Sequence, residues 1–233
     1  MIRLLGLIGG MSWESTAEYY RHINRGIGAR LGGLHSASML LHSIEFGAVA
    51  DLQRAGKWNE LGQMMARSAL GLERAGAEAI VITSNTMHQV ADAVVDAVRI
   101  PLIHIVDPTG KALETAGIKR AGLIGTRYTM ELPFWKERMA RRFGIDVITP
   151  GAEDRAMVHQ VIFDELCLGR ILDASRAAFA EVAERLQASG AEALILGCTE
   201  IGLLIGPQAV SLPAFDTTRF HCEAAVDFSL GSP

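Results

Sequence analysis

The stretch from Gly190 to Gly202 reads GAEALILGCTEIG and decides the fold class of this chain. Its apolar run, Ala193 to Leu196, is short and preceded by small residues, which is typical of a fully buried parallel strand. Cys198 follows that strand, and Thr199 and Glu200 stand where a helix would open. Open α/β sheets bind ligands at the carboxyl ends of their strands. The stretch therefore predicts a thiol at the carboxyl end of a strand, where a ligand would bind.

An earlier stretch repeats this design. Gly76 to His88 reads GAEAIVITSNTMH, with the same GAEA start, another short apolar strand, and then Ser84, Asn85 and Thr86. Ser84 thus takes the position that Cys198 holds in the later stretch. The two motifs predict two polar strand ends of the same construction.

Two further pairs of segments recur at nearly the same spacing. GLIGG at Gly6 to Gly10 is similar to GLIGT at Gly122 to Thr126, and Pro101 to Asp107 is loosely similar to Pro213 to Asp216. Each spacing is close to half of the 233 residues. A repeat of this length indicates two similar α/β lobes, each a parallel sheet covered by helices on both faces.

The predicted lobes have definite boundaries. The first comprises residues 1–107 plus 216–233, and the second comprises residues 108–215. Within them, Ser15 with Glu18 has the form of a capping box at the start of a helix. Asp107 and Pro108 are expected to break the chain before a helix from Thr109 to Ala116. A single helix is expected from Glu131 to Phe143, with a proline in its first turn.

Composition excludes several classes of protein. With 49% hydrophobic and 21% charged residues and a formal net charge of -4, the chain has no basic footprint for nucleic acid. No run of roughly 20 apolar residues predicts a membrane span. The three cysteines, Cys167, Cys198 and Cys222, do not have the spacing of a zinc site or a disulfide framework. We expect no metal and a reducing, cytoplasmic setting.

The motifs SNTMH and LGCTE, with GGMSWEST near the start and the half-length repeat, resemble those of the aspartate/glutamate racemase family. The resemblance covers nearly the whole chain. It implies two flavodoxin-like lobes and cofactor-independent inversion of an amino-acid α-carbon in a cleft between them. It also implies a homodimer, for which the strand Met39 to Ile44 and the pair Tyr19 and Tyr20 are candidate interface segments.

The same resemblance assigns the catalytic pair to Cys198 and Ser84, where the family usually has two cysteines. Inversion needs a base on one face of the α-carbon and an acid on the other. A free thiol has a pKa of about 8.5, which a helix amino terminus can lower. In the family the second cysteine usually serves the L enantiomer. Ser84 has the alternative role of a helix cap, because a hydroxyl is a poor base without a partner such as His88.

Substrate binding is expected from turns at the strand ends. Amides that open the helices after Ser84 and Cys198 are suited to a carboxylate and to the enolate-like charge of the reaction. Relatives often have an Arg where Gln53 stands and a Lys where Cys167 stands, so two partners for a second carboxylate are missing. The expected substrate-binding residues are Met11, Gln53, Asn85, Thr86, Thr126, Tyr128, Thr129 and Thr199.

The sequence therefore predicts a racemase or epimerase of an acidic amino acid, with aspartate and glutamate as the leading substrates. Two alternatives stay open. With only one catalytic cysteine, the chain is also compatible with a decarboxylase of the arylmalonate type, which needs a single proton delivery. A degenerate pair would fit a non-catalytic small-molecule binding protein. A dinucleotide site at Gly6 to Gly10 is disfavoured, because the run is not G-x-G-x-x-G.

Overall fold

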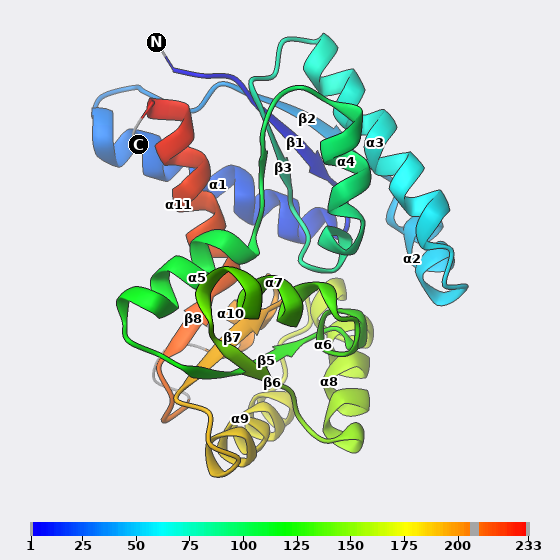
Figure 1. The fold of residues 1–233 in the computed structure, drawn as a ribbon, viewed down its shortest axis with the longest axis vertical. Coiled ribbons are helices and arrows are strands. Elements are labelled where there is room, and N and C mark those ends of the chain that lie inside the picture. Colours follow the sequence, from blue (N-terminus) through cyan, green and yellow to red (C-terminus); the bar gives the residue numbers. More distant parts are fainter. Residues whose placement is uncertain (1, 206–209, 232–233) are drawn as a thin grey trace. The chain divides into compact units, whose positions relative to one another are not determined.

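The computed structural model describes residues 2–205 and 210–231, which form two compact units. Unit 1 contains residues 2–105 and 218–231, and unit 2 contains the described residues of 106–217 (Figure 1). Each unit has a four-stranded parallel sheet flanked by helices. The predicted α/β class with two parallel sheets is confirmed. None of the helices in these described ranges has the length and apolarity that crossing a bilayer requires.

The sheet of unit 1 has the strand order β2-β1-β3-β4. Its central strands, β1 and β3, are fully buried, and Leu5 of β1 lies opposite Met39 of β2 and Ala79 of β3. β2 is an edge strand and is partly exposed. The strands are β1 (Leu5–Gly9), β2 (Met39–Ser43), β3 (Ala79–Ile82) and β4 (Leu102–Ile103).

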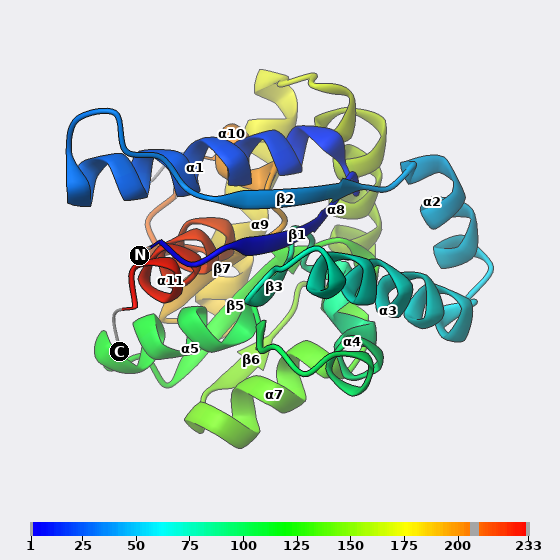
Figure 2. The same ribbon diagram turned by 90° about the horizontal axis from the view of Figure 1, so that it is seen from above.

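Alternating side chains of β1 and β3 build a core on each face of this sheet. Leu5, Leu7 and Val81 pack with α1 and α11, whereas Ile8 and Ile80 pack with α2, α3 and α4 (Figures 1 and 2). This period of two is the expected one for a strand buried on both sides. The helices are α1 (Trp13–Leu31), α2 (Phe46–Arg54), α3 (Trp58–Arg74), the 3-10 helix η1 (Thr86–Val90), α4 (Ala91–Ala97) and α11 (Thr217–Leu230).

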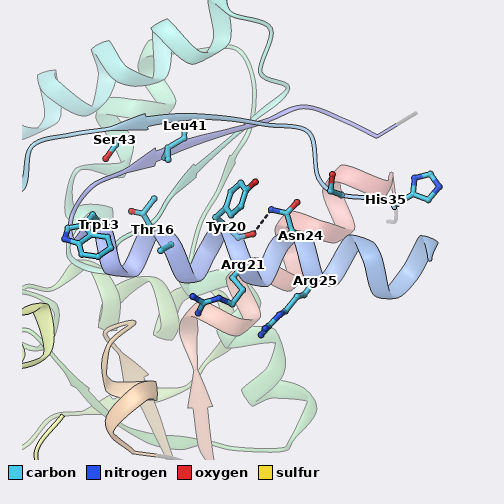
Figure 3. Close-up of a pocket in the computed structure, with 11 residues that line it drawn as sticks. Trp13, Thr16, Tyr20, Arg21, Asn24, Arg25, His35, Leu41 and Ser43 are labelled. Atoms are coloured by element: carbon cyan, nitrogen blue, oxygen red, sulfur yellow. Dashed lines mark hydrogen bonds between the residues drawn. The ribbon is translucent and has the colours of Figure 1, made fainter. Parts of the chain in front are cut away.

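A surface groove of about 850 Å³ runs along the outer side of α1 and the edge strand β2 (Figure 3). Trp13 and Tyr20 are exposed on α1, and Leu41 is exposed on β2. The groove is lined by Trp13, Thr16, Ala17, Tyr20, Arg21, Asn24, Arg25, His35, Ser36, Leu41 and Ser43. Tyr19, in contrast, is fully buried in the core of unit 1, so Tyr20 is the exposed member of this candidate interface pair.

The sheet of unit 2 has the order β6-β5-β7-β8, and β5 pairs with β7 over five residues. One face of this sheet packs against α8 and α9 through a cluster that includes Ile124, Val158, Phe179 and Leu196. The strands are β5 (Arg120–Gly125), β6 (Asp146–Ile148), β7 (Ala193–Gly197) and β8 (Ala214–Asp216). The helices are α5 (Val106–Thr115), α6 (Arg127–Glu131), α7 (Phe134–Phe143), α8 (Ala152–Asp164), η2 (Leu166–Leu168), α9 (Asp173–Ala188) and α10 (Ile201–Leu204).

The predicted capping box at the start of α1 is wrong. The helix begins at Trp13, and the Ser12 hydroxyl caps it by accepting from the Ser15 amide at 3.2 Å. Ser12 has the extended backbone (φ -83°, ψ 174°) that an N-cap requires, whereas Ser15 already lies inside the helix. Glu18 forms an ion pair with Arg21 instead of reaching back to a cap.

Two prolines shift helix boundaries in unit 2. Asp107 and Pro108 lie inside the first turn of α5, where proline is tolerated because its missing N–H needs no partner. The predicted single helix from Glu131 to Phe143 is divided into α6 and α7. Leu132, which precedes Pro133, is extended (ψ 146°), because proline disfavours a helical residue before it.

Close packing of α5 on α7 leads to a stability prediction. A Cβ at Gly110 of α5 would lie 2.3 Å from the Phe143 ring, whereas a Cβ at Gly71 of α3 meets no atom within 4 Å. We expect Gly110→Ala to lower the free energy of unfolding by about 1–2 kcal/mol, because overpacking outweighs the better helix propensity of alanine. Gly71→Ala should raise that free energy by roughly 0.5–1 kcal/mol. Urea unfolding of the two variants checks both signs, and equal effects would contradict the packing argument.

Candidate active site

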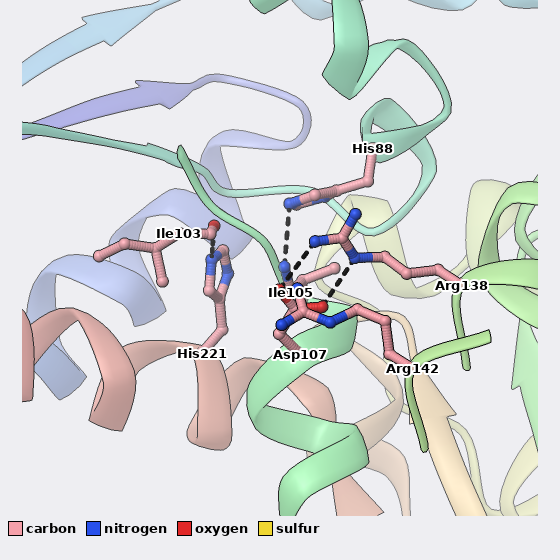
Figure 4. Close-up of polar contacts among 7 residues, drawn as sticks. All are labelled: His88, Ile103, Ile105, Asp107, Arg138, Arg142 and His221. Carbon is pink, nitrogen blue, oxygen red and sulfur yellow. Dashed lines mark hydrogen bonds and ion pairs between the residues drawn. The ribbon is translucent and has the colours of Figure 1, made fainter. Parts of the chain in front are cut away.

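The turn after β3 in unit 1 carries the first predicted motif. Ser84, Asn85 and Thr86 are buried, with 8%, 5% and 6% of their surfaces exposed, and η1 begins at Thr86. The His88 ring lies behind this turn. Its Nδ1 donates to the Ser84 carbonyl at 2.7 Å, and its Nε2 accepts from the Ile105 amide at 3.2 Å (Figure 4). Both ring nitrogens are bonded to backbone, so His88 orients the turn.

A second histidine continues this buried network. His221 of α11 donates from Nε2 to the Ile103 carbonyl at 2.7 Å (Figure 4). Its Nδ1 accepts from the Tyr19 hydroxyl at 2.8 Å. The carbonyl acceptor fixes the proton on Nε2. The His88 and His221 rings are in edge contact, with centroids 5.6 Å apart. These bonds hold the chain after β3 and after β4 in fixed positions.

The turn after β1 lies beside the turn after β3. The Gly10 amide donates to Thr16 Oγ1 at 2.9 Å, and the hydroxyls of Thr16 and Thr83 are 3.1 Å apart. Gly10 has a φ of 89°, and a Cβ there would lie 2.0 Å from the Ile44 carbonyl oxygen. Only glycine fits this turn.

Met11 and Gln53 lie close to the same motif. Met11 belongs to a buried cluster that includes Met87, and Gln53 is 5% exposed with its Nε2 3.2 Å from Met87 Sδ. Unit 1 therefore gathers these two predicted residues around η1, which follows Ser84. Gln53 is held by a weak amide–sulfur contact, in the position where the resemblance implies an Arg.

The turns after β5 and β7 adjoin each other in unit 2. Thr126 caps α6 by accepting from the Thr129 amide at 3.3 Å, and the two hydroxyls are 3.2 Å apart. The side chain of Thr129 borders both Gly125 and Gly197 at the ends of these strands. Thr126 and Thr129 are thus brought to the edge where Cys198 follows β7.

Tyr128 is a buried residue of α6, the helix that Thr126 caps. Its ring is in edge contact with His159, at 5.6 Å between centroids, and its hydroxyl accepts from Arg127 at 3.4 Å. Burial lowers the pKa of His159, and the positive charge of Arg127 lowers it further. His159 is therefore favoured as a neutral ring beside Tyr128.

Cys198 is 9% exposed at the end of β7, and its thiol donates to Glu200 Oε2 at 2.9 Å. A second thiol, that of Cys167 in η2, donates to Glu200 Oε1 at 3.8 Å. Glu200 itself is only 3% exposed. The site thus contains two thiols that share one buried carboxylate, which the sequence analysis did not anticipate. For the Cys198–Glu200 pair a signal was present in the order Cys-Thr-Glu, with the carboxylate two residues after the thiol.

The electrostatic environment of Cys198 is the reverse of the expected one. Burial raises the pKa of its thiol well above the ordinary value, and the charge of Glu200 raises it further. The pKa of Cys167 is also raised, first by burial and then by Glu200. The expected lowering by a helix amino terminus fails because α10 has only four residues and a carboxylate precedes it.

The predicted residues thus form one group in each unit. Unit 1 brings together Met11, Gln53, Ser84, Asn85 and Thr86, and unit 2 brings together Thr126, Tyr128, Thr129, Cys198 and Thr199. None of them lines the groove of Figure 3. Within residues 2–205 and 210–231, no three His, Cys, Asp or Glu side chains form a group suited to a metal ion.

Two parallel α/β sheets, with a hydroxyl and a thiol after equivalent strands, define the two-lobe fold class of the amino-acid racemases. The family model for Asp/Glu/Hydantoin racemases matches residues 8–225, and the chain belongs to that family. It is an isomerase of the amino-acid racemase class.

Three relatives illustrate the similarity. The crystal structure of a candidate Asp/Glu racemase from Yersinia pestis is 48% identical, covers 98% of this chain and 100% of that one, and has a TM-score of 0.91. PH1733, an aspartate racemase homologue from Pyrococcus horikoshii OT3, is 28% identical, with 99% and 100% coverage and a TM-score of 0.82. The broad specificity amino-acid racemase RacX of Bacillus subtilis is 22% identical over 226 residues, or 96% of each chain.

Proposed function

We propose that this enzyme racemises an acidic amino acid, aspartate or glutamate, without a cofactor. In this proposal Cys198 and Ser84 transfer protons on opposite faces of the α-carbon. The observation that carries it is the equivalence of their positions: each follows the strand that is third in its sheet order, β7 in one sheet and β3 in the other. A two-base reaction needs such a pair.

The turns beside these residues suit a carboxylate. Backbone amides and threonine hydroxyls near a strand end are suitable donors for the substrate carboxylate and for the negative charge that develops on it. We assign this role to Asn85, Thr86 and Thr199, and we assign further contacts with the substrate to Met11, Gln53, Thr126, Tyr128 and Thr129. Acidic substrates are supported by the description of PH1733, whereas RacX is described as broad in specificity.

The proposal also covers the cellular compartment in which the enzyme works. All three cysteines, including Cys198, on which the chemistry depends, lie outside any disulfide. We therefore infer a reducing, cytoplasmic compartment, where such thiols persist. The substrate is a small amino acid, and the enzyme acts without nucleic acid or membrane.

Removal of the Cys198 thiol tests the proposal directly. Cys198→Ala should lower both inversion and α-deuterium uptake by about 10²-fold or more, because neither direction has its acid/base on that face. Single enantiomers of a panel of amino acids in deuterated water, followed by optical rotation and by mass, give both rates. Cys222→Ala is the matched control, because Cys222 is buried in the core of unit 1, and it should keep normal rates. Near-normal activity of Cys198→Ala, or carbon dioxide release from a malonate without inversion, would contradict the proposal.

Proton transfer at Ser84 is predicted to be slower than proton transfer at Cys198. Ser84→Cys should raise inversion about tenfold, which corresponds to ~1.4 kcal/mol of barrier. The rise must be equal in both directions, because enantiomers have equal free energy in achiral solution and the ratio of their kcat/KM values is fixed at unity. Ser84→Ala should slow inversion while L substrate still takes up deuterium through Cys198. Equal exchange and inversion rates in the unaltered enzyme, with no gain from cysteine, would show that Ser84 is not limiting.

We propose a homodimer in which the groove along α1 and β2 takes part. Aromatic side chains and arginine are enriched at binding hot spots, and this groove has Trp13, Tyr20 and Arg21 beside the edge strand β2. Leu41→Asp should weaken the dimer by at least about tenfold, since it buries a charge there. Val95→Asp on α4 places the same charge at a similarly exposed apolar residue and should have no effect. Sedimentation at micromolar concentration measures how strongly each variant dimerises. A monomeric unaltered enzyme would disprove the proposal.

A further inference from the structure

We propose that Glu200 is the internal proton acceptor and donor for Cys198, and that Cys167 is a positioning residue that holds the Glu200 carboxylate for this exchange. The inference rests on the proposed function, in which Cys198 is one of the two acid/base residues. It goes further by stating where the thiol proton goes before Cys198 acts as a base. It also gives a role to a cysteine that stands in place of the lysine implied by the family resemblance.

The geometry of the three side chains carries the argument. Cys198 Sγ lies 2.9 Å from Oε2 of Glu200, and Cys167 Sγ lies 3.8 Å from Oε1. Each carboxylate oxygen therefore has its own thiol donor. Glu200 precedes α10 directly, and Cys167 comes from η2. Two separate parts of the chain thus fix the carboxylate from both sides.

Burial makes internal transfer the easier route to a thiolate. Cys198 and Glu200 are both almost inaccessible, so loss of the thiol proton to solvent would place two adjacent negative charges in a low-dielectric site. If the proton moves from sulfur to Glu200, the pair keeps a single negative charge. The raised thiol pKa values of Cys198 and Cys167 show that neither thiol ionises readily beside the carboxylate.

Two charged groups close to η2 and α10 have partners of their own. Arg176 of α9 donates to the Leu204 carbonyl and pairs with Asp173, and Glu165 accepts from Ser175. Asp216 of β8 faces α10 at Gly202, where its carboxylate would lie 3.1 Å from an added Cβ. A further carboxylate on that side opposes additional negative charge, which again favours an exchange that leaves the total charge unchanged.

The proton movements balance. In the first step the Cys198 S–H bond breaks and an O–H bond forms on Glu200, which leaves a thiolate and a neutral acid. In the second step the substrate Cα–H bond breaks and the S–H bond forms again, while the electron pair stays on the substrate as the carbanion. Ser84 then gives its proton to the carbanion, which leaves Glu200 as a neutral acid and Ser84 without its proton. In the reverse direction the enzyme starts from this form: the Cys198 S–H bond breaks toward the carbanion, Glu200 returns its proton to sulfur, and Ser84 carries the proton taken from the substrate. Solvent interconverts the two forms by taking the proton of Glu200 and supplying one to Ser84. Cys167 keeps its proton throughout.

The test compares turnover with thiol reactivity across pH in the full-length enzyme. In the unaltered enzyme, kcat should be nearly flat between about pH 6.5 and 8.5, because Glu200 takes the proton internally. Glu200→Gln keeps the shape but accepts no proton. Its kcat at neutral pH should fall about 10²-fold and then rise about tenfold per pH unit, with KM little changed.

The rate at which iodoacetamide alkylates Cys198, measured by mass spectrometry, should rise in Glu200→Gln, whereas kcat at neutral pH falls. Loss of the neighbouring negative charge lowers the thiol pKa, so Cys198 in Glu200→Gln should react faster than in the unaltered enzyme at the same pH. A Glu200 that only suppresses ionisation would let turnover and alkylation rise together, and a Glu200 that only supports the fold would raise KM. Either result would overturn the inference.

The Cys167 variants test positioning. Cys167→Ala should lower kcat about fivefold without changing KM, because one hydrogen bond to a charged group is lost, and Cys167→Ser should restore it. Equal kcat in the alanine and serine variants would remove Cys167 from the proposal. If Cys198→Ala abolishes exchange but Glu200→Gln keeps the flat pH profile, the racemase proposal stands and this inference fails. If no amino acid is inverted, unchanged alkylation in Glu200→Gln still overturns the inference.

Discussion

Parallel pairing of two central strands is the constraint on which the site in unit 2 depends. β5 and β7 pair from Ala121 and Ala193 to Gly125 and Gly197, so both strands end at the same level. A Cβ at Gly125 would lie 2.8 Å from the Gly197 carbonyl oxygen, which shows how closely the two ends approach. Only this register brings the turn that carries Thr129 against the turn that carries Cys198.

Unit 1 has the same parallel pairing of its two central strands, but different side chains hold the turn that follows. β1 pairs with β3, and the Thr83 amide extends the ladder by donating to the Ile8 carbonyl at 3.0 Å. Behind Ser84, the turn is held by a histidine rather than by a second acidic or thiol group. The repeat has therefore kept the backbone of the two strand ends while the side chains around them have diverged. Cys198 has a carboxylate partner within reach, whereas the His88 nitrogens are occupied by backbone.

The sequence predicted the sheets well because their signals are local and repeated. The GAEA and GLIG pairs identified four of the buried strands, and short apolar runs between small residues allow few other structures. Helix boundaries were less predictable where proline was involved, since Pro108 lies within a helix and Pro133 separates two. Pro108 is in the first turn of α5 and Pro133 is the N-cap of α7, and proline is tolerated at this end of a helix.

The candidate site was predictable in its members but not in its electrostatics. A strand end followed by Cys-Thr-Glu placed the thiol at the sheet edge, but the effect of Glu200 depends on which way its side chain turns. Cys167 is 33 residues from Glu200 in sequence and meets it only through the fold of η2. A single sequence contains no signal for such a contact. The pKa of the Cys198 thiol is raised, and not lowered as the sequence predicted, because the thiol is buried and lies beside the Glu200 charge.

The path of the chain through the two units has a consequence for synthesis on the ribosome. Unit 2 is continuous in sequence, whereas the core of unit 1 needs Cys222, Ala225 and Val226 of α11 to cover Leu5 and Leu7. Domains usually fold from the amino terminus onward as the chain emerges. Here the order is reversed, because the half that is translated first must wait with part of its sheet uncovered until residues 218–230 have left the ribosome.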